Sequence, residues 1–196
     1  MSDTNTSATG GPLAPLPPAV EDDRPLEDFL QSIIVGITGL PGPMVRPRWQ
    51  PEPPALPPRG TDWAAIGIVR STPDVFAFER HVPIGDGDDE FQRHEVFDLE
   101  CSFYGPNADE YADLLRDGLA VAQNREPLFL VGIGVVQSGI RTRAPILLKE
   151  KWLKRSDLTV TLRREIRRTY PVLTVLKAGG TLVDDTGAST TFEAGT

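Results

Sequence analysis

The first regular pattern in the chain starts at residue 26, where apolar side chains recur every three or four residues. This spacing gathers them on one face of a helix, and the stripe consists of Leu26, Phe29, Leu30, Ile33, Ile34 and Ile37. Pro25 stands just before the stripe and Glu27 lies in the first turn, as is typical of a helix start. We therefore expect an amphipathic helix from Pro25 to the Leu40-Pro41-Gly42-Pro43 run, which cannot continue it.

A second helical pattern follows residue 107. Asn107 and Glu110 have the spacing of a capping box. The apolar stripe behind them consists of Tyr111, Leu114, Leu115, Leu119 and Ala122. Pro127 lacks the amide hydrogen that a continuing helix needs. The sequence thus predicts one helix that ends near Arg125.

Elsewhere apolar and polar residues alternate, as they do in half-buried strands. Residues 94–104 alternate most regularly, so one face of that strand should be buried and the other should lie in solvent or an interface. The predicted buried face holds Phe97, Leu99, Cys101 and Phe103. We expect further strands at residues 63–69, 75–82, 128–136, 157–170 and 172–177, with the 157–170 strand pointing Leu158, Val160, Leu162, Ile166 and Tyr170 inward.

The order helix, strands, helix, strands lacks the regular alternation of βαβ units. It indicates an α+β fold: a mostly antiparallel sheet with two main helices packed on it. Residues 44–49 should form a short extended piece, and residues 50–60 a stiff connector whose prolines cannot donate to a sheet. Residues 146–154 are ambiguous between a helical turn and a loop.

Composition shifts define the expected domain organisation. Residues 1–24 are rich in Pro, Gly, Ser and Thr and carry the acidic run Glu21-Asp22-Asp23, so we expect a disordered Pro-rich tail. A docking motif is the alternative interpretation of this tail, since Pro12-Leu13-Ala14-Pro15 and the prolines after it favour extended polyproline II structure. Residues 25–184 should form the α+β domain, and residues 185–196 a flexible C-terminal tail.

Composition also narrows the chemistry. The 196 residues carry a net charge of -8, which argues against general affinity for duplex DNA. The one cysteine, Cys101, excludes an intramolecular disulfide. The two histidines, His81 and His94, leave little material for a metal or catalytic cluster. We expect no metal and no cofactor.

No motif assembles an active site. Gly132, Gly134 and Gly139 lack the spacing of a dinucleotide-binding loop. The acidic turn at residues 86–90 lacks the spacing of a Ca²⁺ loop. Cys101 lies on an apolar strand face, where it should be buried and inert. His81 and His94 flank a turn and could face each other in a hairpin. Because no nucleophile, base and orienting group come together, we expect no enzyme.

Charge is segregated along the chain. Residues 61–137 carry a net charge of -10, whereas residues 138–196 carry +5. An acidic surface of one copy could meet a basic surface of the next, and such head-to-tail contacts close into a ring when the rotation permits.

The sharpest case is the run Arg163-Arg164-Glu165-Ile166-Arg167-Arg168. On a strand, Arg163 and Arg167 share one face while Arg164 and Arg168 share the other. At least one pair should therefore meet carboxylates of another element or subunit. A single-stranded nucleic-acid-binding module would use the same arginines, but aromatic stacking platforms are lacking nearby in the sequence.

Three stretches together are similar to one known family. Residues 26–54, with Arg46-Pro47-Arg48-Trp49 at their end, resemble the opening of the phage neck terminator, or tail terminator, proteins. Residues 61–68 resemble the run that follows, and residues 155–170 resemble the closing hairpin. The resemblance covers roughly residues 25–184.

This resemblance implies a structural virion protein of a tailed phage. Such proteins form a ring, typically of six copies, that caps the tail tube, ends its polymerisation and joins it to the head connector. Phage DNA passes through the ring without specific binding. The implied partners are other copies, the tail tube protein and connector or neck proteins. The implied location is the virion, after assembly in the host cytoplasm. The main alternative is another neck, head-completion or baseplate component.

Charge then suggests which residues do what. An acidic lumen repels DNA phosphates, so we expect channel-facing carboxylates in the middle segment. The candidates are Glu95, Asp98, Glu100, Asp109 and Asp113. We expect the subunit interface where the basic strand meets an acidic segment. The candidates there are Arg163, Arg164, Arg167 and Arg168.

Overall fold

The structure is a computed structural model that describes residues 5, 7–16, 24–148, 150–175 and 177–195. The chain divides into two compact units. The helix-bearing unit comprises residues 20–77 and 93–166, and the hairpin unit comprises residues 1–19, 78–92 and 167–196. Of the predicted disordered tail, residues 1–24, the residues 1–4, 6 and 17–23 lie outside the described residues, so the disorder of this tail stays a prediction.

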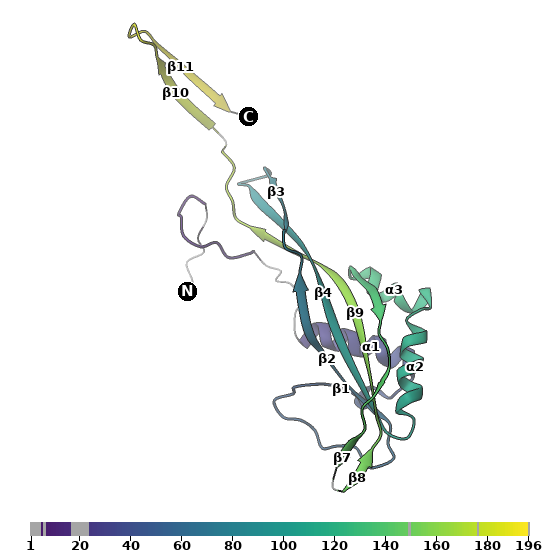
Figure 1. Cartoon of the computed structure of the whole chain (residues 1–196). Coiled ribbons are helices and arrows are strands. Elements are labelled where there is room, and N and C mark those ends of the chain that lie inside the picture. Colours follow the sequence, from purple (N-terminus) through teal and green to yellow (C-terminus); the bar gives the residue numbers. More distant parts are fainter. Residues whose placement is uncertain (1–4, 6, 17–23, 149, 176, 196) are drawn as a thin grey trace. The chain divides into compact units, whose positions relative to one another are not determined.

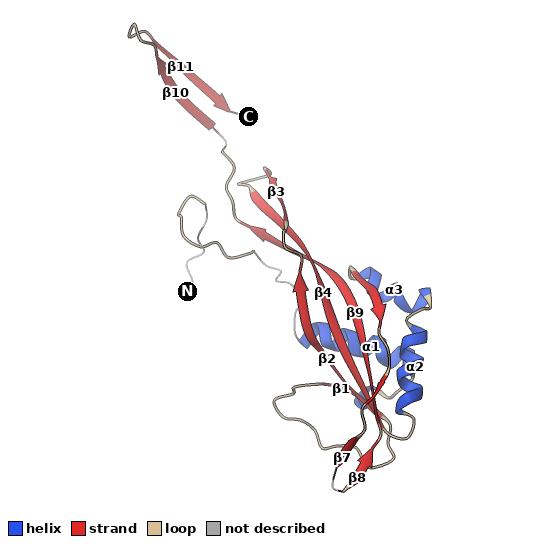
Figure 2. Ribbon diagram, in the orientation of Figure 1, coloured by secondary structure: helices blue, strands red, loops and turns tan. Residues whose placement is uncertain are grey.

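A seven-stranded sheet is the main element of the fold (Figure 2). Its central order is β1-β2-β4-β9-β5, while β3 pairs with β4 and β6 pairs with β9. The strands are β1 (Val45–Pro47), β2 (Trp63–Pro73), β3 (Phe78–Val82), β4 (Asp88–Tyr104), β5 (Ile133–Ser138), β6 (Thr142–Arg143) and β9 (Arg155–Tyr170). β1 and β2 run parallel to each other. The described pairs β2–β4, β3–β4, β5–β9 and β6–β9 are antiparallel. The predicted α+β class with a mostly antiparallel sheet is confirmed.

Helix α1 (Arg24–Thr38; Figure 1) begins and ends where the sequence predicted. In its stripe Leu26, Leu30 and Ile34 are buried, and Phe29, Ile33 and Ile37 are partly buried against the core. The second predicted helix is wrong in its extent. The chain forms α2 (Ala108–Gly118) and a separate α3 (Ala122–Leu130) that runs through Pro127, so β5 starts at Ile133. α2 ends at Gly118, where the close approach of α1 leaves no room for a side chain, because a Cβ there would lie 2.3 Å from Cγ2 of Ile37.

α2 starts where the sequence predicted, but not through the predicted capping box of Asn107 and Glu110. Asn107 is the N-cap residue, but its side chain makes no capping hydrogen bond. Its backbone N–H donates to Asp62 at 2.9 Å and its Nδ2 donates to the same carboxylate at 3.0 Å. Gly105, with φ of 112°, lets the backbone pass this close to Asp62. A residue 45 positions away thus accepts the backbone N–H that the local motif assigned to the Glu110 side chain.

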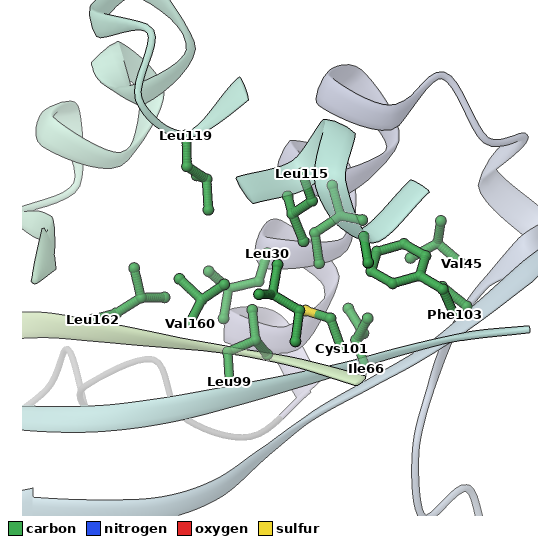
Figure 3. Close-up of a cluster of buried hydrophobic side chains, with 14 of the residues drawn as sticks. Leu30, Val45, Ile66, Leu99, Cys101, Phe103, Leu115, Leu119, Val160 and Leu162 are labelled. Atoms are coloured by element: carbon green, nitrogen blue, oxygen red, sulfur yellow. The ribbon is translucent and has the colours of Figure 1, made fainter. Parts of the chain in front are cut away.

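The core lies on one face of the sheet, beneath all three helices (Figures 2 and 3). Phe97, Leu99, Cys101 and Phe103 of β4 are at most 3% exposed, as predicted. Leu158, Val160 and Leu162 of β9 lie beside them. Leu30 of α1, Leu115 of α2 and Leu128 of α3 close the core from the helix side. The opposite face carries no described helix, and we call it the helix-free face (Figure 2).

Several boundaries differ from the predictions. β3 starts at Phe78 instead of residue 75, and β4 starts at Asp88, so the acidic turn is shorter than expected. The ambiguous residues 146–154 contain the hairpin β7 (Ile146–Leu148) and β8 (Lys151–Leu153). Residues 171–175 form no strand. Instead β10 (Lys177–Val183) pairs with β11 (Ser189–Gly195), so the segment beyond residue 184, which we expected to be flexible, contributes a strand. Its Thr190, Thr191 and Phe192 favour strand structure and can pair as a ribbon even though they bury little.

Candidate functional site: the charged surfaces

The helix-free face carries a layer of paired charges. Arg48 donates to Glu100 at 2.9 Å and also to the Ser102 hydroxyl, which donates to Asp157 at 2.5 Å. Arg155 approaches the same Asp157 at 2.7 Å. Ser102 is fully buried, so this layer is part of the folded subunit and not a loose surface.

The layer continues along the same face towards the other end of β4. Arg70 lies 2.6 Å from Asp98, and the hydroxyl of Thr161 donates to the same carboxylate at 2.8 Å. Arg163 pairs with Asp74 at 2.8 Å. Positive and negative groups alternate across the face, so opposite charges largely cancel within one copy.

Asp109 is the centre of a second charged cluster, at the start of α2. Arg141 approaches its carboxylate at 2.7 Å, Arg143 at 3.1 Å and Lys154 at 3.2 Å. The hydroxyl of Ser156 donates to it as well. The cluster ties the first turn of α2 to the segment that carries the +5 net charge. The acidic and basic parts of the sequence therefore meet inside one chain, which the sequence analysis placed between copies.

Asp109 should make stability depend on pH in the acid range. The Ser156 hydrogen bond is the largest cause that lowers the pKa of this carboxyl, with Lys154 and Arg143 adding to it against partial burial, from 3.8 to about 2. Because the folded pKa is depressed, the stabilisation is present above about pH 4 and is lost as pH falls towards 2. Thermal unfolding followed by circular dichroism should show a melting temperature that drops between pH 4 and 2 by roughly 5 °C more in the wild type than in Asp109→Asn. Equal drops in both proteins would contradict the assignment.

Arg164 lies on the core face and pairs with Glu95. Its Nε donates to Glu95 at 2.6 Å, and the guanidinium lies 5.8 Å from the centre of the Phe97 ring. The two side chains are only 10% and 11% exposed. The predicted contact between this arginine and a carboxylate of another element therefore occurs within the chain, between β9 and β4.

Arg167 and Arg168 lie in the hairpin unit beside a polar pocket of about 270 Å³. Phe78 and Phe91 line the pocket with them, together with Arg80, which pairs with Glu90 at 2.6 Å. Pairing of β3 with β4 brings these aromatic rings to the arginines. The expectation that aromatic residues are lacking near the arginines is therefore wrong, because Phe78 and Phe91 are distant in sequence but close to the arginines in space.

The structure distributes the five channel candidates over both sides of the sheet. Asp98 and Glu100 belong to the helix-free face, whereas Glu95 faces the core and Asp109 and Asp113 lie on α2. Glu95 and Asp98 are each 8% exposed and are bound to basic residues of their own chain. The five candidates therefore do not share one face of the sheet, and their place relative to a channel stays a prediction. The members with the most accessible side chains are Asp113, at 36%, and Glu100, at 25%.

Cys101, His81 and His94, the residues considered for chemistry, are buried in the core or bound to carboxylates of the same chain. Cys101 is fully buried, and burial raises the pKa of its thiol to about 12. His81 and His94 do not face each other, because His81 lies opposite Asp89 and bonds to it at 2.6 Å, while His94 lies 3.8 Å from Glu165. Among the described residues, no group of three His, Cys, Asp or Glu side chains is arranged to hold a metal ion. Within the same residues, no helix has the length and apolar character to cross a membrane.

One surface feature was missed altogether. A groove lies between the proline-rich connector and the β7–β8 hairpin, and Trp152 lies in it although its side chain is 73% exposed. The run Lys151-Trp152-Leu153-Lys154 was the available signal, since a tryptophan between lysines in a segment without a clear period is seldom a core residue.

Comparison with known proteins decides the family of this chain. A model of the phage neck terminator protein family matches residues 24–186. The chain belongs to the phage neck terminator protein family. No curated protein matches the sequence. The resemblance drawn from residues 26–54, 61–68 and 155–170 is therefore confirmed, and the protein is a structural component of the phage neck and tail.

Family membership also fits the surfaces described above. The neck terminator family is one of structural proteins, which implies a role without catalysis and contacts with tail tube and neck components. Such contacts need shaped and charged surfaces, and both units of the chain carry them. The helix-bearing unit has the Asp109 cluster and the groove, and the hairpin unit has the arginine pocket.

Proposed function

We propose that copies of this chain form a ring, of six subunits, that caps the tail tube, ends its polymerisation and joins the tail to the head connector. The match to the neck terminator family over residues 24–186 carries this proposal. The ring works by shape and performs no reaction. It assembles in the host cytoplasm and remains in the virion.

Termination follows from the difference between the two faces of a ring. The open end of a tube presents unpaired surface that is complementary to the next tube ring. A terminator that matches this surface on one side and presents a different surface on the other prevents further addition. The mixed α+β fold suits this task, because helices cover one face of its sheet while paired charges cover the other.

The subunit interface should involve the arginines that the fold leaves accessible. Arg164 is used inside the chain, where it balances Glu95. Arg167 is exposed and Arg168 is half-buried, and both border the pocket of the hairpin unit. We therefore place the contact with an acidic surface of the next copy at Arg167 and Arg168, with Arg163 at the margin because it also binds Asp74.

The channel wall should be acidic, because carboxylates repel the phosphates of DNA in transit. The outward side of α2 fits best among the candidates. Asp113 is 36% exposed and Asp117 is 71% exposed, one turn apart on that helix. Glu95 and Asp98 fit less well because they are buried beside arginines of their own chain, whereas Asp113 and Asp117 remain more accessible although both pair with Arg116.

Ring formation is tested by imaging the purified full-length protein. Negative-stain electron microscopy should show closed rings with a central hole, and light scattering should give a mass of about six subunits. Adding tail tube protein should produce tubes that carry a ring at one end and no longer elongate. A protein that stays monomeric at concentrations of about 10 µM or higher, and that leaves tube growth unchanged, would overturn the proposal.

A further inference from the structure

The groove at Trp152 has an apolar interior and a basic rim. Its volume is about 270 Å³, and both tryptophan rings that line it, Trp63 and Trp152, come from strands of the helix-bearing unit. Leu56 and Pro57 of the connector form part of the opposite wall. Stacking of Trp63 on Tyr104, with ring centres 4.1 Å apart, holds the inner ring in place. The groove is therefore a formed feature of the fold.

Three cations, Arg59, Lys151 and Lys154, line this groove, and no carboxylate is among its described lining residues. Arg59 donates to the carbonyl of Leu148 at 3.2 Å, which joins the connector to the hairpin. Lys154 donates to the carbonyl of Pro106 at 3.0 Å. Lys151 is exposed, with no ion pair recorded among the described residues. Lys154 forms an ion pair with Asp109 at 3.2 Å, and it shares this carboxylate with Arg141 and Arg143.

These surroundings select one kind of ligand. Exposed indole rings bind proline and small apolar side chains, because such residues lose little conformational entropy when they stack. A basic rim adds attraction for carboxylates and disfavours cationic peptides. The fitting ligand is a short extended segment in which prolines and an apolar residue are followed by acidic residues.

The chain itself contains such a segment directly before α1. Residues 17–23 read Pro17-Pro18-Ala19-Val20-Glu21-Asp22-Asp23, and they lie outside the described residues. Three acids end the segment, which matches the three cations of the groove in number and opposite sign. A docking motif is the alternative to a disordered tail for this part of the chain, and the groove supplies the binding site that a docking motif needs.

We propose that the groove of one copy binds residues 17–23 of a neighbouring copy. The two prolines and Val20 lie against Trp152, and the acids face Lys151, Lys154 and Arg59. The proposal rests on the ring only in that a ring holds a second copy nearby. There the effective concentration of the segment is of order millimolar, so an intrinsic Kd of about 10–100 µM is sufficient for occupancy. The segment then acts as a strap between subunits.

A peptide titration tests the chemistry of the groove without requiring rings. The receptor is the full-length chain carrying Glu21→Gln, Asp22→Asn and Asp23→Asn, which weakens its own segment as a competitor. A labelled peptide of residues 12–24 should bind it with a Kd of about 10–100 µM by fluorescence anisotropy, and the same peptide with the three acids amidated should bind about tenfold more weakly or worse.

Matched receptors locate the binding. Lys151→Glu in that receptor should weaken the acidic peptide about tenfold, and Trp152→Ala should do likewise. Lys177→Glu, an equal charge change in the hairpin unit, should leave the affinity unchanged. All receptors should retain the wild-type melting temperature, since these side chains are exposed. Equal binding of the two peptides, no binding at millimolar peptide, or no effect of Lys151→Glu would overturn the proposal.

Crosslinking tests whether the segment comes from a neighbour. A photoreactive benzoylphenylalanine replaces Trp152 in full-length chains, and isotope-labelled and unlabelled copies are mixed before assembly. Crosslinks should join position 152 of one copy to residues 17–23 of another. Crosslinks within one copy, or to an acidic segment of a different neck protein, would overturn the assignment. Rings without these crosslinks refute the strap alone. Peptide binding by a protein that never forms rings refutes the ring, and with it the strap between subunits, but not the ligand chemistry of the groove.

Discussion

Replacing Arg164 by alanine should destabilise the chain by about 3–5 kcal/mol, because the change leaves the carboxylate of Glu95 buried without its partner. The two groups are 2.6 Å apart and about a tenth exposed, next to Phe97 at the edge of the core. Water cannot replace the guanidinium there without disturbing the packing. Urea unfolding of Arg164→Ala, followed by tryptophan fluorescence, gives the loss directly.

The neighbouring arginine provides the control. Arg163→Ala removes the same side chain one position earlier on β9, where its ion pair with Asp74 is 47% and 42% exposed. Exposed pairs contribute about 1 kcal/mol or less. A loss at Arg163→Ala as large as at Arg164→Ala would show that the burial of the second pair does not matter. The double change Glu95→Gln with Arg164→Met should recover most of the lost stability, because it leaves no unpaired charge behind.

Reversing the charges at Arg167 and Arg168 should abolish ring formation. The double variant Arg167→Glu with Arg168→Glu changes the charge of each copy by four units. At every interface of a closed ring it would then replace attraction by repulsion of an acidic surface. Light scattering and negative-stain imaging should show monomers where the wild type forms rings, at the same protein concentration. Rings that persist in this variant would contradict the assignment of the interface.

The controls separate assembly from folding. The far-ultraviolet circular dichroism and the melting temperature of the double variant should stay close to those of the wild type, because Arg167 is exposed and Arg168 is only half-buried. Lys177→Glu reverses a charge elsewhere in the hairpin unit and should leave rings intact. Arg164 is unsuitable for this experiment, since reversing a buried charge beside Glu95 would unfold the subunit before any interface could be tested.

Local pattern determined the elements with a strong period. Leu26, Leu30 and Ile34 repeat at helical spacing and are buried in α1, and Phe97 to Phe103 alternate and are buried in β4. In both cases a single element must hide its own apolar side chains, so the period alone identifies the buried face. The same logic failed at Gly118, where α2 ends and Ile37 of another helix leaves no room for a side chain.

Contacts between distant residues determined the rest. Asp62 accepts the backbone N–H of Asn107 before α2, which the local motif assigned to Glu110, and β11 forms from residues whose composition indicated a flexible end. Phe78 and Phe91 reach the arginine pocket through strand pairing. No local pattern carries this information, since each contact depends on which strand becomes the neighbour of which.

The sequence by itself determined the α+β class, the buried faces of α1, β4 and β9, and, through the resemblance of three stretches, the family. Only the tertiary structure decided where the charges lie: Asp109 with Arg141, and Arg164 with Glu95, are joined inside one copy. The physical reason is that hydrophobic periodicity is a property of one segment, whereas an ion pair is a property of two, and the sequence does not state which two are brought together.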